Sequence, residues 1–194
     1  MSKEKIRRMV ETAVLMALIL VLSFTPLGYL KIGTVSITFI MIPVAIGAIM
    51  EGPGTGAFLG MVFGATSFIQ CFGMDAFGTT LLGINPVFTF ITCMVPRVLM
   101  GWLCGWIFRW LRPVDKNGIV GSAVASLSGA VLNTVLFIGF LLLFFGSSEY
   151  IQNFGINVWE ILTVLFVINA AVEAAVCLVV GTAVSVALLR AFKR

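Results

Sequence analysis

Long apolar runs separated by short turns are the feature that most constrains this chain. Its 194 residues are 60% hydrophobic and only 10% charged, whereas a soluble domain is roughly half apolar and about a quarter charged. Such a chain cannot cover a water-facing surface, so lipid must be its main solvent. A spanning helix needs roughly 20 mostly apolar residues. We therefore predict an all-α integral membrane protein, a compact bundle of six transmembrane helices.

Turn residues divide the chain into six segments within a single domain, residues 1–194. A tight turn rich in Gly and Pro occupies residues 51–56, and a longer mixed loop occupies residues 71–85. Pro86 suits the first turn of the helix that follows this loop. The predicted helices cover about residues 9–26, 37–50, 55–70, 86–111, 118–145 and 158–192.

The cationic residues indicate the orientation of this bundle. Ten of the 12 Lys and Arg residues fall on one side of it. They are Lys3, Lys5, Arg7, Arg8, Arg109, Arg112, Lys116, Arg190, Lys193 and Arg194. Cytoplasmic loops of membrane proteins carry an excess of Lys and Arg, so we predict that both termini are cytoplasmic. An even number of helices agrees with termini on the same side.

Several function classes are excluded by what the chain lacks. It has no His, its four Cys show no CxxC spacing, and no acidic pair or nucleophile–base arrangement is apparent. We predict no enzyme activity, no metal and no cofactor, and we interpret the cysteines as packing residues. The net charge of +4 follows from topology and does not indicate nucleic-acid binding. If the chain takes part in active transport, it has no room for an ATPase of its own, so the energy must come from an ion gradient or another subunit.

Small residues line two of the predicted helices. Gly56, Gly60 and Gly64 share one face of the helix 55–70, and the helix 118–145 carries a similar stripe. Helices in lipid associate by close van der Waals contact, which small residues permit. We interpret both stripes as packing faces. On the first helix, Ala13 and Ala17 form an AxxxA pair, which either docks another subunit or packs on a neighbouring helix.

Polar residues recur at a similar depth in the last three helices. Arg97 follows Asn85 by 12 residues, and Asn169 follows Asn157 by the same interval. At 1.5 Å per residue, both side chains lie roughly 18 Å from the outer loops, near the midplane. Asn133 lies midway along its helix. Ionisable groups at this depth usually face a cavity or a partner.

Two hypotheses explain these residues. In the first, Arg97, Asn133, Asn169, Glu173 and Asn85 line a pocket that opens to the outside. Arg97 then binds a carboxylate or phosphate, and the asparagines bind hydroxyls or amides. In the second, Arg97 and Glu173 form a buried ion pair between two helices. Few Trp or Tyr lie near this pocket, which favours a flexible polar ligand over a large planar ring.

The chain resembles the substrate-binding S components of energy-coupling factor (ECF) vitamin transporters. The resemblance rests on six helices in about 190 residues, on the Ala13/Ala17 pair, and on the segment TFIMIPVAIGAIMEGPGTGAFLGMVFGATSF, Thr38–Phe68. It implies a multi-pass protein of the bacterial cell membrane that captures a vitamin from outside. It also implies that Ala13 and Ala17 contact a T component and that two ATPases drive uptake.

The segment LLGINPVFTFITCMVPRVLMGWLCGWIF, Leu81–Phe108, is most similar to S components of the pantothenate type. Pantothenate has one carboxylate, two hydroxyls and an amide, which suit Arg97 and the two asparagines. Folate, riboflavin and a queuosine precursor are the alternative substrates. A secondary transporter that works alone is the alternative class, although it would typically show internal repeats.

Overall fold

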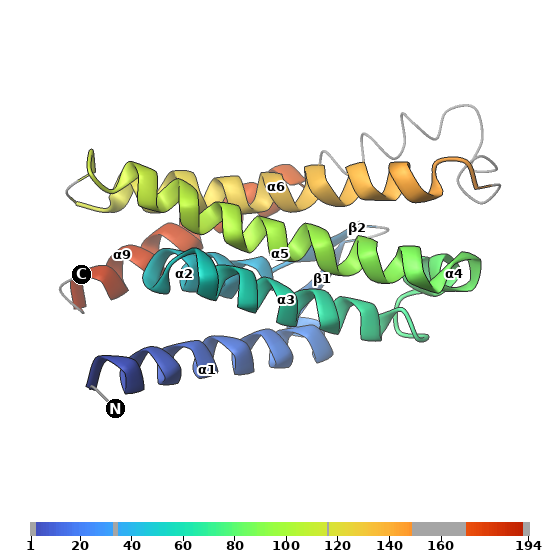
Figure 1. Cartoon of the computed structure of the whole chain (residues 1–194), viewed down its shortest axis with the longest axis horizontal. Helices are drawn as coiled ribbons and strands as arrows, with labels where there is room; N and C mark the ends of the chain where they lie inside the picture. The colour runs from blue at the N-terminus through green and yellow to red at the C-terminus, as the bar shows by residue number, and fades with distance from the viewer. Residues whose placement is uncertain (1–2, 33–34, 116, 149–169, 192–194) are drawn as a thin grey trace.

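The computed structural model describes residues 3–32, 35–115, 117–148 and 170–191. Figure 1 shows helices that run side by side, with both ends of the chain at one end of the molecule and α4 at the other. The elements are α1 (Lys3–Phe24), η1 (Pro26–Gly28), β1 (Tyr29–Ile32), β2 (Val35–Thr38), α2 (Met41–Glu51), α3 (Pro53–Gln70), α4 (Ala76–Ile84), α5 (Pro86–Leu111), α6 (Ile119–Phe145), the π-helical segment η2 (Cys177–Gly181) and α9 (Thr182–Ala191).

Three of the described helices are long and apolar enough to cross a membrane. They are α5, α6 and the helix Ala170–Ala191, which contains η2 and α9. The other described helices do not combine length and hydropathy in this way: α1 begins with a run of charges, and α2 has only 11 residues. The apolar helices agree with a membrane protein, while six spans remain a prediction. Residues 158–169 of the last predicted helix lie outside the described residues.

A short β hairpin interrupts the predicted all-helical chain. Strands β1 and β2 pair antiparallel, with Tyr29 opposite Thr38 and Ile32 opposite Val35. The predicted helix 37–50 is therefore wrong at its start, because Ile37 and Thr38 belong to β2 and α2 begins only at Met41. Strand β2 is VSIT, three of whose four residues are β-branched, a residue type that favours strands over helices.

The prediction of six helices is also wrong in number. Counting Ala170–Ala191 as one, the described residues contain seven helices, because α4 forms within the predicted loop 71–85. The Oδ2 atom of Asp75 accepts a hydrogen bond from Gly78 N at 2.7 Å and so caps the first turn of α4. An Asp at this position satisfies one of the free N–H groups that begin a helix.

Helix α3 packs against α5 so closely that the backbones of the two helices are in contact at the glycines of α3. A Cβ atom on Gly60 would collide with the carbonyl of Arg97, and one on Gly56 would collide with the carbonyl of Gly101. The predicted packing role of the glycine stripe is therefore confirmed. Because α3 can approach α5 this closely, the backbone at Arg97 is held directly against α3.

Helix α1 lies on the outside of α2 and α3 (Figure 1). Its first turns are joined to α2 by an ion pair in which Arg8 Nε lies 3.2 Å from Glu51 Oε2. Ile19 is fully buried against the core, whereas Val14 is 62% exposed. One face of α1 thus packs on the bundle and the other is open.

Replacing Gly60 with Ala should destabilise the protein, because the new Cβ must push α3 away from the Arg97 carbonyl. Overpacking of this kind costs about 1–3 kcal/mol. Gly54→Ala on the same helix is the matched control, since a Cβ there meets nothing within 4 Å. Thermal unfolding of the purified variants in detergent measures the difference. Equal melting temperatures for the two variants would contradict the packing argument.

Candidate ligand-binding site

A cavity of about 720 Å³ lies among the ends of α1, α3, α4 and α5 and the middle of α6. This is the end of the bundle that carries α4, away from both ends of the chain (Figure 1). The lining residues are Ser23, Phe24, Thr25, Pro26, Thr38, Phe63, Ser67, Gln70, Cys71, Met74, Asp75, Phe77, Gly78, Leu81, Thr89, Thr92, Cys93, Arg97, Asn133 and Phe137. Its size is typical of small-molecule sites.

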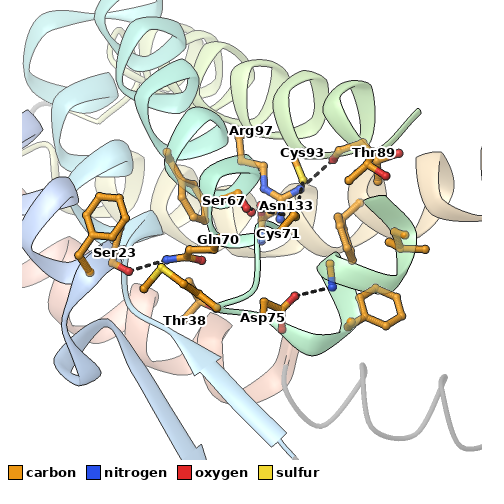
Figure 2. Close-up of a pocket in the computed structure, with 18 of the residues that line it drawn as sticks. Ser23, Thr38, Ser67, Gln70, Cys71, Asp75, Thr89, Cys93, Arg97 and Asn133 are labelled. Carbon is orange, nitrogen blue, oxygen red and sulfur yellow. Dashed lines mark hydrogen bonds between the residues drawn. The ribbon is translucent and has the colours of Figure 1, made fainter. Parts of the chain in front are cut away.

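Arg97 is the buried cation of this cavity, with 8% of the residue exposed. Its guanidinium carbon lies 4.6 Å from the ring centroid of Phe137 on α6 and 5.5 Å from that of Phe63 on α3. Aromatic faces attract cations within about 6 Å, so the two rings hold the guanidinium from different helices. The figure of the site shows Arg97 pointing toward Asn133 and Cys93 (Figure 2).

Pro96 determines one contact of the arginine. Proline has no N–H, so a proline inside a helix leaves the carbonyl four residues earlier without its usual partner. In α5 that carbonyl belongs to Thr92, and Arg97 Nη1 donates a hydrogen bond to it at 2.8 Å. The local sequence thus supplies an acceptor that orients the guanidinium.

Two polar atoms beside Arg97 are buried and lack partners among the described residues. They are Asn133 Oδ1 on α6 and Thr92 Oγ1 on α5, both from residues that line the cavity. Buried polar atoms in folded proteins normally have hydrogen-bond partners, so a buried polar atom without one needs a physical explanation. A polar ligand in the cavity would satisfy both atoms.

The part of the cavity wall formed by α1 and α3 is held together by hydrogen bonds between these two helices. Ser23 Oγ donates to Thr66 Oγ1 at 3.0 Å, and Gln70 Nε2 donates to the carbonyl of Ser23. These bonds fix Gln70 and the end of α1 at the edge of the cavity (Figure 2). The remaining polar lining groups include the exposed carboxylate of Asp75, which is engaged in the cap of α4.

The structure brings two of the predicted site residues, Arg97 and Asn133, into one cavity. Glu173 lies behind its wall: it is 7% exposed, and its Oε1 accepts a hydrogen bond from Thr38 N at 2.7 Å. Asn85 does not line the cavity, because its Oδ1 accepts from Val87 N and Phe88 N and caps α5.

The remaining predicted residues lie elsewhere. Asn169 is outside the described residues. Within the described part of the chain, no ion pair joins Glu173 to Arg97. Ala13 and Ala17 are both exposed on the open face of α1.

Most of the residues that line the cavity were not predicted from the sequence. Phe63, Phe137 and Thr92 position or neighbour Arg97, yet phenylalanines and threonines are too common in apolar helices to be singled out. A proline inside a predicted helix was the available signal for Thr92. The cap of α4 by Asp75 was readable as well, because Asp is a preferred residue at the start of a helix.

The arrangement is suited to binding an anionic organic molecule. A buried guanidinium favours a carboxylate or phosphate, the amide and hydroxyl beside it can bind polar groups, and Phe side chains supply apolar contact. Among the described residues, no group of three or more His, Cys, Asp or Glu could hold a metal ion.

Comparison with known proteins identifies a family and two related transporters. Residues 7–185 match the family described as the substrate-specific component of ECF transporters. The chain is 34% identical over 152 residues to the pantothenate transporter PanT of Leuconostoc mesenteroides, covering 70% of this chain and 72% of the relative. It is 28% identical over 166 residues to the pantothenic acid transporter PanT of Lactococcus lactis subsp. cremoris, covering 79% of this chain and 78% of the relative.

The family match extends over nearly the whole length of the chain, from the first turns of α1 to α9. The apolar helices and the cavity with its buried arginine are consistent with such a protein. This chain therefore belongs to the family of substrate-specific components of ECF transporters.

Proposed function

We propose that this chain captures pantothenate from outside the cell and delivers it through a T component that is driven by two ATPases. The observation that carries the proposal is the buried guanidinium of Arg97 at the wall of a cavity of about 720 Å³. Two relatives that bear the names of pantothenate and pantothenic acid transporters support the choice of substrate.

The chemistry of pantothenate matches the cavity group by group. Its carboxylate pairs with the Arg97 guanidinium, which can donate two parallel hydrogen bonds to it. Its hydroxyls and amide satisfy Asn133 Oδ1 and Thr92 Oγ1, the two orphan atoms beside the arginine. No Trp or Tyr is among the described lining residues, in keeping with a ligand that has no aromatic ring.

The proposed orientation places this cavity on the outer side of the membrane. Both ends of the chain lie at the end of the molecule opposite α4 (Figure 1), and the excess of Lys and Arg near the termini favours the cytoplasm. The cavity lies at the α4 end, so it faces the outside of a bacterial cell membrane. Six spans and two cytoplasmic termini are part of this proposal.

The open face of α1 is the proposed contact with the T component. Ala13 and Ala17 are exposed there beside Val10, which is 57% exposed, and Val14, which is 62% exposed. Small residues on an exposed helix face permit close approach of a second helix in lipid. The packed face, which includes Ile19, is used within the chain itself.

Arg97→Ala should abolish tight pantothenate binding. Removing one partner of a buried, hydrogen-bonded charge pair costs about 2–5 kcal/mol, so we expect the Kd to rise at least about 30-fold. Isothermal titration calorimetry of the purified protein measures this change. Arg109→Ala is the matched control, because Arg109 is an exposed arginine of the same helix that lies over Trp106 and away from the cavity.

A ligand analogue separates binding from folding in this experiment. The alcohol analogue of pantothenate has a hydroxymethyl group in place of the carboxylate, so it should bind the unmodified protein much more weakly. Arg97→Ala should bind acid and alcohol equally. If the variant still prefers the acid, the carboxylate is bound elsewhere.

A vitamin screen on the unmodified protein that finds folate, riboflavin or a queuosine precursor bound tightly instead would reassign the substrate.

Ala13→Trp and Ala17→Trp should leave pantothenate binding unchanged and prevent assembly with the T component, because an indole blocks the close helix contact. Co-purification with a tagged T component and calorimetry measure the two properties. Val124→Trp on α6, where Val124 is 38% exposed, is the control that should assemble normally. Loss of ligand binding together with assembly would place this face inside the fold. Pantothenate uptake by the chain alone in vesicles would support the stand-alone transporter instead.

A further inference from the structure

Two cysteines that are distant in sequence meet at the wall of the cavity. Cys71 directly follows α3 and Cys93 lies in the first half of α5, and their Sγ atoms are 3.9 Å apart. Both residues are buried, at 3% and 6% exposure, and both are free thiols. We refer to them as the Cys71/Cys93 pair (Figure 2).

The cavity gives small solutes access to this pair. Both cysteines belong to its lining, so a molecule inside the cavity reaches them without unfolding of the chain. The other two cysteines, Cys104 and Cys177, do not line the cavity. Cys104 is fully buried and its Sγ donates a hydrogen bond to the carbonyl of Ala125 at 3.1 Å. Only the Cys71/Cys93 pair thus combines a close second thiol with access from the cavity, among the four cysteines.

We propose that the Cys71/Cys93 pair is a redox-sensitive site, which a small peroxide converts into a disulfide that lowers the affinity of the cavity for its ligand. A ligand in the cavity in turn protects the two thiols. Only the identity of that ligand rests on the proposed function, because the thiol chemistry is independent of it.

The chemistry balances with hydrogen peroxide as the two-electron oxidant. One thiol loses its proton and the resulting thiolate attacks a peroxide oxygen; the O–O bond breaks, a sulfenic acid forms, and the leaving hydroxide takes up that proton to become water. The second thiolate then attacks the sulfenic sulfur, an S–S bond forms, and the hydroxyl leaves as a second water after taking up a proton. The two sulfur atoms lose two electrons in total, and the peroxide gains them.

The disulfide must change the shape of the cavity wall. A disulfide bond is about 2.05 Å long, whereas the two Sγ atoms are 3.9 Å apart, so the end of α3 and α5 must approach or the side chains must rotate. Arg97 lies one turn beyond Cys93 on the same face of α5. The disulfide would therefore form within one helical turn of the guanidinium, in the same cavity wall.

Helix α4 packs against Cys71 of this pair. A Cβ on Gly78 would lie 2.6 Å from Cys71 Sγ, which shows how closely α4 packs on that sulfur. Gly78 also donates its N–H to Asp75, in the turn that begins at Cys71. Displacement of Cys71 thus moves both α4 and the turn. In the proposal, oxidation lowers ligand affinity, and linkage then requires that bound ligand disfavour the disulfide by the same coupling free energy.

The first experiment tests the bond itself. The purified protein is treated with hydrogen peroxide, excess oxidant is removed, and intact mass together with maleimide labelling counts the remaining thiols. We expect loss of two hydrogen atoms, a fall from four free thiols to two, and a cross-linked peptide that contains both cysteines. Cys71→Ser and Cys93→Ser should each prevent the cross-link. A variant with Cys104→Ala and Cys177→Ala should still form it. Oxidation of single cysteines without the cross-link would overturn the proposal.

The second experiment tests the coupling to the cavity, using the variant with Cys104→Ala and Cys177→Ala. Saturating pantothenate should slow disulfide formation at least tenfold, and the oxidised protein should bind pantothenate at least tenfold more weakly until dithiothreitol restores it. Equal affinities of the oxidised and reduced forms would overturn the proposed coupling. If the reduced protein binds no pantothenate, the proposed function fails, while the cross-linked peptide still decides whether the pair is a redox site.

Discussion

The backbone contact between α3 and α5 is the constraint on which the rest of the structure depends. Gly60 faces the carbonyl of Arg97, and Gly56 faces that of Gly101, so at these two positions backbone meets backbone. Helices in lipid gain little from hydrophobic burial against each other, so such close contact supplies the packing energy. Because the contact includes the backbone of Arg97, the packing of the bundle also positions the cation of the cavity.

A buried arginine in an apolar bundle is costly unless its charge and its N–H groups are compensated. Here α3 and α6 contribute the rings of Phe63 and Phe137, and α5 contributes the carbonyl of Thr92, which Pro96 leaves free. These contacts orient the guanidinium. A ligand carboxylate would add a charge-assisted contact to the guanidinium, which links the stability of this region to occupancy of the cavity.

Sequence reasoning recovered the membrane class, the glycine packing and the two cavity residues Arg97 and Asn133. It failed at the hairpin, because the β-branched residues Ile37 and Thr38 of β2 were assigned to the start of a helix although residues of this type favour strands. It also assigned Asn85 to the site, although a side-chain oxygen that begins a helix is already engaged by backbone N–H groups. Spacing along the chain gives depth in a bundle, but it does not give the direction of a side chain.

What the sequence determined by itself was therefore the solvent and the helical class, because apolar length and charge are additive properties of the chain. Tertiary structure alone decided which polar groups meet. Cys71 and Cys93 are separated by 22 positions and share no motif, yet α3 and α5 bring their sulfur atoms within 3.9 Å. Convergence of this kind depends on helix rotation and packing, which local sequence patterns do not encode.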